Sequence, residues 1–174
     1  MKFPSAFTNS DEQHINVIIE TPRGSRNKYA YDEETELFKL KHMLPAGTTF
    51  PLDFGFVPNT KAEDGDPVDV LVLSEQPIEP GILLECRLLG VLMAEQQDPG
   101  EEPQRNDRLV AVPLVSHDYA TYQTITDIGD ERINDIVHFF SYYHEMENGR
   151  FTLLGTQGPD KARDLIKQQQ HQEA

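Results

Sequence analysis

Glu63-Asp64-Gly65-Asp66-Pro67-Val68-Asp69-Val70 is the stretch on which the interpretation of the whole chain depends. Three of its acids, Asp64, Asp66 and Asp69, come just ahead of an apolar run that continues to Leu73. Because Asp66 precedes proline, its backbone favours an extended conformation, so Asp64 and Asp66 point the same way while Asp69 opens the following strand. The spacing therefore predicts that three carboxylates converge at the entrance of a strand.

Carboxylates that lie this close repel one another unless a cation sits between them. An oxygen-only set of ligands, without histidine or cysteine, suits Mg²⁺, with Mn²⁺ as a possible substitute. One hypothesis is thus a phosphate-handling Mg²⁺ site, and the other is a solvated Asp-Gly turn that leads into a strand. An EF-hand loop is excluded, because counting from Asp64 places Val68 where a ligand is required and Asp69 where glycine is required.

The composition indicates a single domain over residues 1–174, with about ten N-terminal and about seven C-terminal residues frayed. Cys86 is the only cysteine, so no disulfide framework exists and a reducing compartment is expected. No signal-peptide core and no run of apolar residues long enough to span a membrane occur, which predicts a soluble, cytoplasmic protein. The formal charge of −15 opposes binding to nucleic acids and to anionic membranes.

Apolar runs bounded by turn residues, together with alternating apolar residues in the second and third segments, predict mostly strands in the first two thirds of the chain. The expected strands cover residues 15–20, 28–31, 37–40, 70–74, 81–94 and 108–112, of which the second and third form a hairpin. Residues 44–58, with three prolines and two glycines among aromatics, are expected to form an ordered loop. Residues 95–107 form a polar excursion between two strands.

Two helices are expected to close the chain. Helical spacing over residues 131–146 predicts a stripe that faces the core: Ile133, Ile136, Val137, Phe140, Tyr143 and Met146. A second helix is expected over 161–167 after Pro159, followed by a glutamine-rich tail that frays. These elements predict an α+β fold, mainly β: a small twisted barrel with two C-terminal helices packed on it.

The order of these signals resembles that of a known family. They are a strand that ends in Glu20, then Lys28-Tyr29, the aromatic segment 50–58, the acids of 64–69, Arg108-Leu109-Val110-Ala111-Val112-Pro113 and a helix with Tyr143. From about residue 16 to residue 165 the chain resembles the soluble inorganic pyrophosphatases of the Mg²⁺-dependent, OB-fold type. The resemblance implies a five-stranded, OB-like closed barrel, hydrolysis of inorganic diphosphate to two phosphates with several Mg²⁺ ions, and commonly a hexamer.

The resemblance also implies roles for individual residues. Asp64, Asp66 and Asp69 correspond to metal-binding acids, with Asp66 as the catalytic base beside the attacking water, and Glu20 acts through metal-held waters. The residues that match phosphate-contacting positions are Lys28, Lys41, Arg108 and Tyr143, of which Arg108 replaces a lysine and Lys41 an arginine. Asn106 stands where the family has a metal-binding aspartate, and strand alternation places it on the same face as Arg108. The alternative is that a β-bulge turns Asp107 inward instead.

Several further departures cluster at the same positions. The family has tyrosines at Phe50 and Phe54, a glutamate at Ala30, an aspartate at or near Gln96, and a lysine at His144. Acids and a cation have thus been lost together, while Asp64, Asp66 and Asp69 are kept. This pattern indicates a remodelled site that holds fewer metal ions and grips its anion less strongly.

Other interpretations remain open for these residues. Lys28 and Lys41 are also typical of an exposed hairpin, Glu20 of a solvated strand end, and Tyr143 of a helix core. The other histidines lack partners by spacing: His138 and His144 are six apart, which does not suit a zinc pair on one helix face, and His42 stands alone.

Three functions are consistent with these features. The first is Mg²⁺-dependent diphosphate hydrolysis. The second is hydrolysis of another phosphoanhydride, such as a short polyphosphate or a nucleotide, and the third is a non-catalytic homologue that binds metal or phosphate. A homo-oligomer, with a hexamer suspected, is expected from the resemblance and from His138, Phe139 and Tyr142, which lie off the core-facing stripe.

Overall fold

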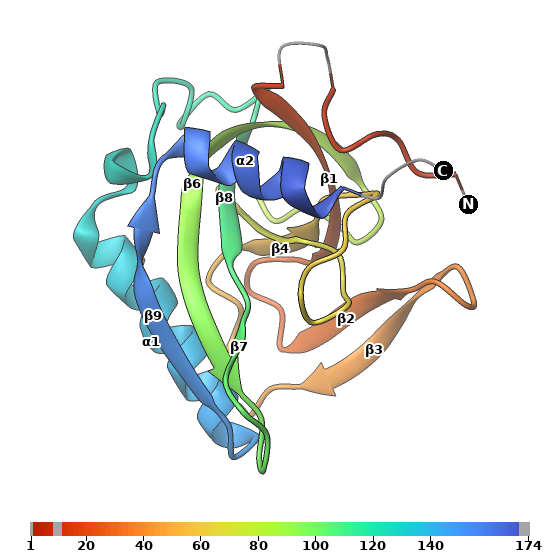
Figure 1. Ribbon diagram of the computed structural model, residues 1–174, viewed down its shortest axis with the longest axis vertical. Helices are drawn as coiled ribbons and strands as arrows, with labels where there is room; N and C mark the ends of the chain where they lie inside the picture. Colours follow the sequence, from red (N-terminus) through yellow and green to blue (C-terminus); the bar gives the residue numbers. More distant parts are fainter. Residues whose placement is uncertain (1, 9–11, 171–174) are drawn as a thin grey trace.

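A computed structural model describes residues 2–8 and 12–170 of the chain (Figure 1). The strands are β1 (His14–Thr21), β2 (Asn27–Asp32), β3 (Leu37–Met43), β4 (Asp53–Phe56), β5 (Asp69–Val72), β6 (Leu83–Gln97), β7 (Gln104–Arg105), β8 (Arg108–Pro113) and β9 (Arg150–Gln157). The helices are the short 3₁₀ helix η1 (Ile125–Ile128), α1 (Asp130–Met146) and α2 (Pro159–Gln169). The mainly β fold with two longer helices is thereby confirmed.

A ring of strands forms the barrel. Strand β1 pairs antiparallel with β4 on one side and with β6 on the other. Strand β4 also pairs antiparallel with β5. Strand β5 pairs parallel with β8, and β8 pairs antiparallel with β6. Because the order β1-β4-β5-β8-β6 comes back to β1, these strands form a closed barrel, as the resemblance implies. The hairpin β2–β3 forms a separate two-stranded sheet beside the barrel (Figure 1).

The central strands are buried on both faces. Val70 and Val72 of β5 belong to a core cluster that also includes Ile166 of α2. Leu71, between them, belongs to a second cluster that includes Phe140 of α1. Side chains alternate between the two faces of a strand, so α2 covers the core on one face and α1 covers it on the other. This explains why the strands read as continuous apolar runs.

Strand β4 lies within the segment that was expected to be an ordered loop. All four of its residues are buried between β1 and β5. The strand has a glycine at position 55 because no side chain fits there: a Cβ at this position would lie 2.4 Å from the backbone oxygen of Ile18. The close approach of β4 to β1 therefore requires glycine, whereas glycine and proline in the sequence suggested a loop.

Two further elements differ from the sequence-based expectation. Strand β9 lies between the two helices and pairs with β6, yet only Phe151 of its residues is buried. A strand so exposed lacks the apolar alternation by which strands are recognised. Residues 95–107, which were expected to form a polar excursion, contain regular structure. Strand β6 continues to Gln97 and pairs there with the short strand β7.

Both ends of the described chain pack against the barrel, where fraying was expected. Phe7 is 8% exposed and pairs with Ile15 in an isolated bridge. Helix α2 continues two residues beyond the predicted end, and Gln170 pairs with Thr60. The expected fraying of the last four residues lies outside the described residues. None of the helices that the structure describes is long and apolar enough to cross a membrane.

Candidate active site

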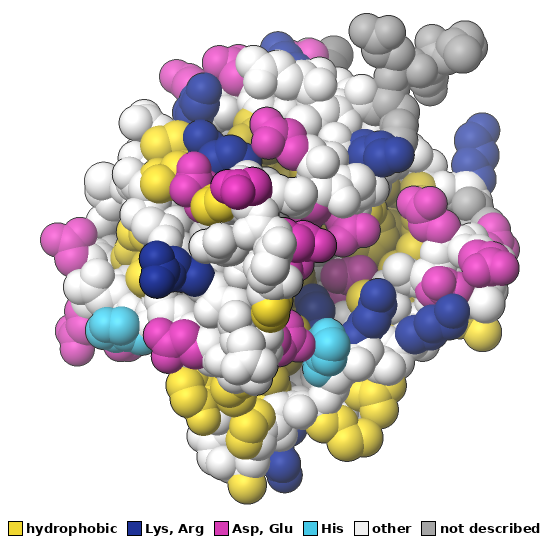
Figure 2. Space-filling view, turned by 60° about the horizontal axis from the view of Figure 1, so that its bottom comes forward, with side chains coloured by type: hydrophobic (Ala, Val, Ile, Leu, Met, Phe, Trp, Pro, Cys, Tyr) yellow, Lys and Arg dark blue, Asp and Glu magenta, His cyan; other side chains and the backbone are white. Residues whose placement is uncertain are grey.

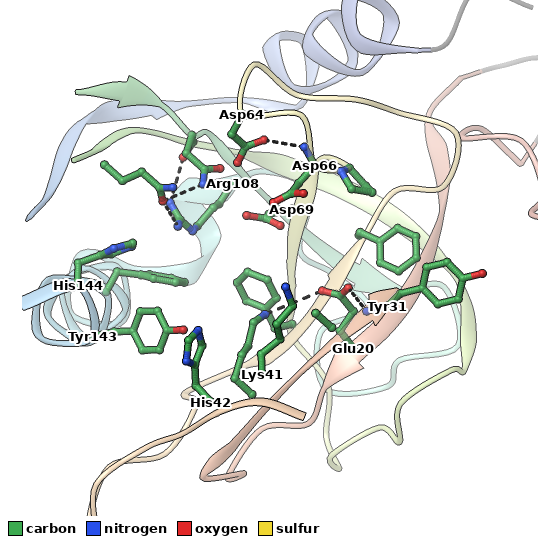
Figure 3. Close-up of a pocket in the computed structure, with 18 of the residues that line it drawn as sticks. Glu20, Tyr31, Lys41, His42, Asp64, Asp66, Asp69, Arg108, Tyr143 and His144 are labelled. Carbon is green, nitrogen blue, oxygen red and sulfur yellow. Dashed lines mark hydrogen bonds and ion pairs between the residues drawn. The ribbon is translucent and has the colours of Figure 1, made fainter. Parts of the chain in front are cut away.

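A cavity of about 520 Å³ opens beside the barrel. Figure 2 shows a hollow on one face of the molecule where acidic and basic side chains gather. Its walls come from the hairpin β2–β3, the loop before β5, the start of β8 and the C-terminal part of α1 (Figure 3). Every residue to which the sequence assigned a role lines this cavity: Glu20, Lys28, Lys41, Asp64, Asp66, Asp69, Asn106, Arg108 and Tyr143.

The three acids of the central stretch share this cavity. Asp64 and Asp66 sit in one tight turn, in which a carboxylate oxygen of Asp64 accepts a hydrogen bond from the Asp66 backbone N–H at 3.0 Å. Asp69 is the first residue of β5 and pairs with Phe56 of β4 and Arg108 of β8. Among the described residues, no three His, Cys, Asp or Glu side chains are grouped closely enough to form a ready-made metal site. The carboxylates of Asp64, Asp66 and Asp69 thus line one cavity, but they are not grouped closely enough to form a metal site by themselves.

Burial destabilises the charged forms of three acids in the cavity, and nearby cations offset this effect only in part. Burial raises the pKa of Asp69 to about 7, even though Arg108 and Lys28 act in the opposite direction. Burial also raises the pKa of Asp64 above its ordinary value. The same cause raises the pKa of Glu20, although Lys28 and the backbone N–H of Tyr31 oppose it. Desolvation disfavours each carboxylate, so a cation in this cavity would be stabilised.

Lys28 lies between an acid and an aromatic ring. Its Nζ is 3.9 Å from a carboxylate oxygen of Glu20 and 3.7 Å from the centroid of the Phe54 ring. Burial lowers the pKa of Lys28, and the charge of Glu20 partly opposes this shift. The face of an aromatic ring attracts a cation without donating or accepting a hydrogen bond. Phe54 therefore orients Lys28 in a position where a tyrosine would offer a hydroxyl group.

The strand entrance at β8 places Asn106 and Arg108 in the cavity. Both residues are buried, at 7% and 3% exposure, and both line the wall. Asp107 lies on the other side, where its carboxylate accepts hydrogen bonds from the Arg105 guanidinium and from the backbone N–H of Ala94. The strand register is thus the one that alternation predicts, and the alternative bulge that would turn Asp107 inward is not observed.

Helix α1 contributes Tyr143 and His144, and its core-facing side keeps Ile136 and Phe140 of the expected stripe and adds His144. Burial raises the pKa of the Tyr143 hydroxyl to about 12. His144 is one of the most buried residues of the helix, and burial lowers its pKa to about 4. Phe139, expected to lie off the core-facing stripe, packs on Phe50 with ring centroids 5.1 Å apart. Because Phe50 lines the cavity, Phe139 packs against a residue of the cavity wall.

One contact of the rim was missed in the sequence. His42 of β3 lies with its Nε2 3.4 Å from a carboxylate oxygen of Glu147, just after α1. Both residues line the cavity, and they connect the hairpin to the helix across its edge. No spacing rule could pair residues so far apart in the chain, and His42 accordingly appeared to have no partner.

Fold and cavity together define an OB-like barrel protein whose cavity combines acidic and basic side chains. The family model described as "Inorganic pyrophosphatase" matches residues 17–174. An inorganic pyrophosphatase from Nostoc sp. is 37% identical over 154 residues, which are 88% of each chain. One from Aeropyrum pernix is 37% identical over 156 residues, 88% of this chain and 86% of that relative.

Solved structures agree with these relatives. The crystal structure of the inorganic pyrophosphatase from Thermus thermophilus superimposes with a TM-score of 0.86 at 31% identity, and covers 95% of this chain and 93% of that chain. The structure from Helicobacter pylori also gives 0.86, at 29% identity, over 97% of this chain and 96% of that chain. The chain belongs to the inorganic pyrophosphatase family.

Proposed function

We propose that the protein hydrolyses inorganic diphosphate to two phosphates, with Mg²⁺ as its cofactor and Mn²⁺ as a possible substitute. The observation that supports this most directly is that desolvated carboxylates and cationic side chains share one cavity. A doubly charged metal ion bound to the acids would offset their repulsion, and the lysines and arginine suit a substrate made of phosphoryl groups. Family membership indicates that this substrate is diphosphate.

The side chains that would hold Mg²⁺ are Asp64, Asp66, Asp69 and Asn106, with Glu20 acting through water. All of their donor atoms are oxygens, which is the chemistry that Mg²⁺ prefers. The raised pKa values of Asp64 and Asp69 mean that burial destabilises their charged forms, which a metal ion would stabilise, so these residues fit the ion. Bound Mg²⁺ would lower the pKa of a water molecule and offset the charge of the diphosphate.

Asp66 is proposed as the catalytic base. It is exposed at the mouth of the cavity, where its carboxylate can take a proton from the water that attacks one phosphorus atom. As the new P–O bond forms, the bond to the bridging oxygen breaks, and the leaving phosphate keeps the electron pair. Lys41 and Tyr143 lie across the cavity from Asp66 (Figure 3), and Lys28 lines the same cavity, so these three side chains would bind that leaving group.

Hydrolysis of a larger phosphoanhydride is a second candidate. Ala30 and Phe54 line the cavity with groups smaller or less polar than the family has there, and a volume of about 520 Å³ leaves space beyond a diphosphate. A short polyphosphate or a nucleotide would use the same acids and cations. The third candidate, a homologue that binds metal or phosphate without turnover, keeps the cavity but predicts no product.

Release of phosphate from diphosphate, triphosphate and a nucleoside triphosphate separates these candidates, when each is measured with and without Mg²⁺. We expect the highest turnover with diphosphate, and a loss of about 10²- to 10⁴-fold in Asp66→Asn, as for removal of a general base. Asp107→Asn is the matched control, because it makes the same chemical change on the other side of the strand entrance. Turnover that is absent in the wild type, or equal in Asp66→Asn, would exclude this mechanism.

We further propose that the protein is a cytoplasmic homo-oligomer, with a hexamer as the suspected form. Tyr142 is 48% exposed on the outer side of α1, and His138 is exposed beside it, which suits an interface. Light scattering at micromolar concentration tests this proposal, and a monomer mass would contradict it.

A further inference from the structure

Strand β3 carries Lys41 at the exposed edge of the hairpin. Within the described residues the backbone of β3 pairs with β2 alone, and six of its seven residues are exposed. Near the hairpin turn, the ring of Phe38 lies beside Gly81, and just past the strand Leu44 is buried. Residues 39–43, between these two anchors, are all exposed. The position of Lys41 therefore depends on contacts made within this exposed span.

A β-bulge directs Lys41 and His42 into the same space. Lys28 is opposite His42 and Tyr29 is opposite Leu40, so Lys41 is an extra residue without a counterpart on β2. Neighbouring side chains of a regular strand point to opposite faces, yet Lys41 and His42 both line the cavity (Figure 3). A bulge re-aims side chains in this way and is common beside active sites. The two side chains are thus presented to the cavity together.

His42 contacts the end of α1 at the edge of the cavity. Its Nε2 lies 3.4 Å from a carboxylate oxygen of Glu147, and the two side chains are 49% and 44% exposed. An imidazolium attracts a carboxylate, and an uncharged imidazole can still donate a hydrogen bond from Nε2. Because His42 follows Lys41 directly, a contact that restrains His42 also restrains the bulge that contains Lys41.

Glu147 also acts on a group of the cavity that is proposed to bind phosphate. Burial, and after it the charge of Glu147, raises the pKa of the Tyr143 hydroxyl to about 12. The Glu147 carboxylate is therefore close enough to repel an anion bound beside Tyr143. A protonated His42 in contact with Glu147 offsets that negative charge. The contact thus has two effects: it joins the hairpin to the helix, and it reduces repulsion at the edge of the cavity.

We propose that His42 and Glu147 are positioning residues, whose contact holds the bulge of β3 against the end of α1 and thereby fixes Lys41 for the substrate. The part that Lys41 plays in binding diphosphate rests on the proposed function, and the inference adds how its position is maintained. Neither His42 nor Glu147 touches the reacting atoms in this arrangement. Both act through Lys41 and through the charge beside Tyr143.

Two alternatives give different results. If the bulge fixes Lys41 without help, loss of the contact between His42 and Glu147 changes neither the mobility of β3 nor the KM for diphosphate. If His42 itself binds the substrate, its loss raises the KM but leaves the mobility of β3 in substrate-free protein unchanged. Mobility and KM must therefore be measured on the same variants.

Hydrogen exchange of the β3 amides and steady-state kinetics test the proposal. His42→Phe keeps a planar ring and deletes both ring nitrogens. We expect β3 to exchange about two- to fivefold faster in substrate-free protein, and the KM for diphosphate at saturating Mg²⁺ to rise about two- to fivefold, because a half-exposed pair contributes modestly. The kcat should change less than about twofold, since the reacting groups are untouched. His117→Phe is the matched control, because His117 is exposed and does not line the cavity.

Two further variants show whether the contact itself is responsible. His42→Arg supplies another cation for Glu147 and should return both the exchange and the KM toward wild-type values. Glu147→Gln should speed the exchange of β3 in the wild-type background, and it should have no further effect in His42→Phe, where the contact is already lost.

The proposal is overturned if β3 of His42→Phe exchanges as slowly as β3 of His117→Phe. It is also overturned if the KM of His42→Phe is unchanged, or if that KM rises without faster exchange. A wild-type protein that releases no phosphate from diphosphate would refute the proposed function. The exchange measurements, made without substrate, would still decide whether the contact between His42 and Glu147 holds the hairpin.

Discussion

Two groups of acids in this protein have opposite surroundings. Asp53 is fully buried, and its carboxylate accepts hydrogen bonds from the backbone N–H groups of Arg23 and Ile78 and from the hydroxyl of Ser74. Glu75 likewise accepts from the backbone N–H groups of residues 117 and 118, and these and a neighbouring hydroxyl lower its pKa to about 2. These acids have donors on the protein and connect loops to the barrel.

Asp64 and Asp69 show the reverse pattern. The Asp64 carboxylate accepts a backbone hydrogen bond from Asp66, and no side-chain hydrogen bond of the Asp69 carboxylate is found within the described residues. Burial raises the pKa of each carboxylate, to about 7 for Asp69. An acid whose donors are built into the fold stabilises that fold, whereas an acid without donors costs free energy until a ligand arrives. The difference separates structural acids from site acids without reference to any relative.

Replacing a site acid is expected to have the largest effect. Asp69→Asn removes a buried charge and a proposed metal ligand while it keeps the shape of the side chain. We expect Mg²⁺-dependent turnover to fall about 100-fold or more, while the free energy of unfolding in chelator rises by about 1–3 kcal/mol. Phosphate release and urea unfolding measure the two effects. A variant that unfolds more easily than the wild type would show that Asp69 stabilises the fold, and the contrast with Asp53 would be lost.

Replacing the structural acid Asp53 should lower the free energy of unfolding, whereas replacing the site acid Asp69 should raise it. Asp53→Ala leaves two partly buried backbone N–H groups and a buried hydroxyl without their acceptor. We expect the free energy of unfolding to fall by about 2–4 kcal/mol, because buried donors lose their partners. Asp53 does not line the cavity, so the folded fraction should keep its turnover. Lost turnover in protein that is still folded would place Asp53 in the site after all.

The parts of the site that could be predicted from the sequence are those encoded locally. Asp64, Asp66 and Asp69 lie within one turn and one strand start, and strand alternation alone separates Asn106 from Asp107. The contact between His42 and Glu147 depends on how a hairpin meets a helix, which no local pattern encodes. Strand β4 was missed for a related reason, since the close approach to Ile18 that requires Gly55 appears only in the folded barrel.

A substitution at Asn106 can add one more acid to the group of site acids. Asn106→Asp adds a carboxylate beside the site acids, so we expect the half-saturating Mg²⁺ concentration to fall by a few-fold, since charge on a ligand strengthens cation binding. Asp107→Asn should leave it unchanged, because Asp107 is held by Arg105 outside the cavity. Titration of Mg²⁺ against turnover measures both variants. Loss of activity in Asp107→Asn alone would show that the strand register differs from the one observed.

The smallest expected effect concerns the pH dependence of stability through Glu75. Hydrogen bonds hold the pKa of Glu75 at about 2, below its ordinary value, so its contribution to stability is fully present above about pH 4.5 and is lost as the pH falls toward 2. Glu75→Gln keeps an acceptor oxygen but takes up no proton. We therefore expect the free energy of unfolding, measured in urea between pH 5 and pH 3, to depend on pH less steeply in the variant, by up to about one proton. Glu79→Gln, an exposed glutamate on the same loop, is the control and should change the slope less. Equal slopes for wild type and Glu75→Gln would mean that the hydrogen bonds from residues 116–118 do not distinguish the charged carboxylate from the neutral one, and Glu75 would no longer belong with Asp53.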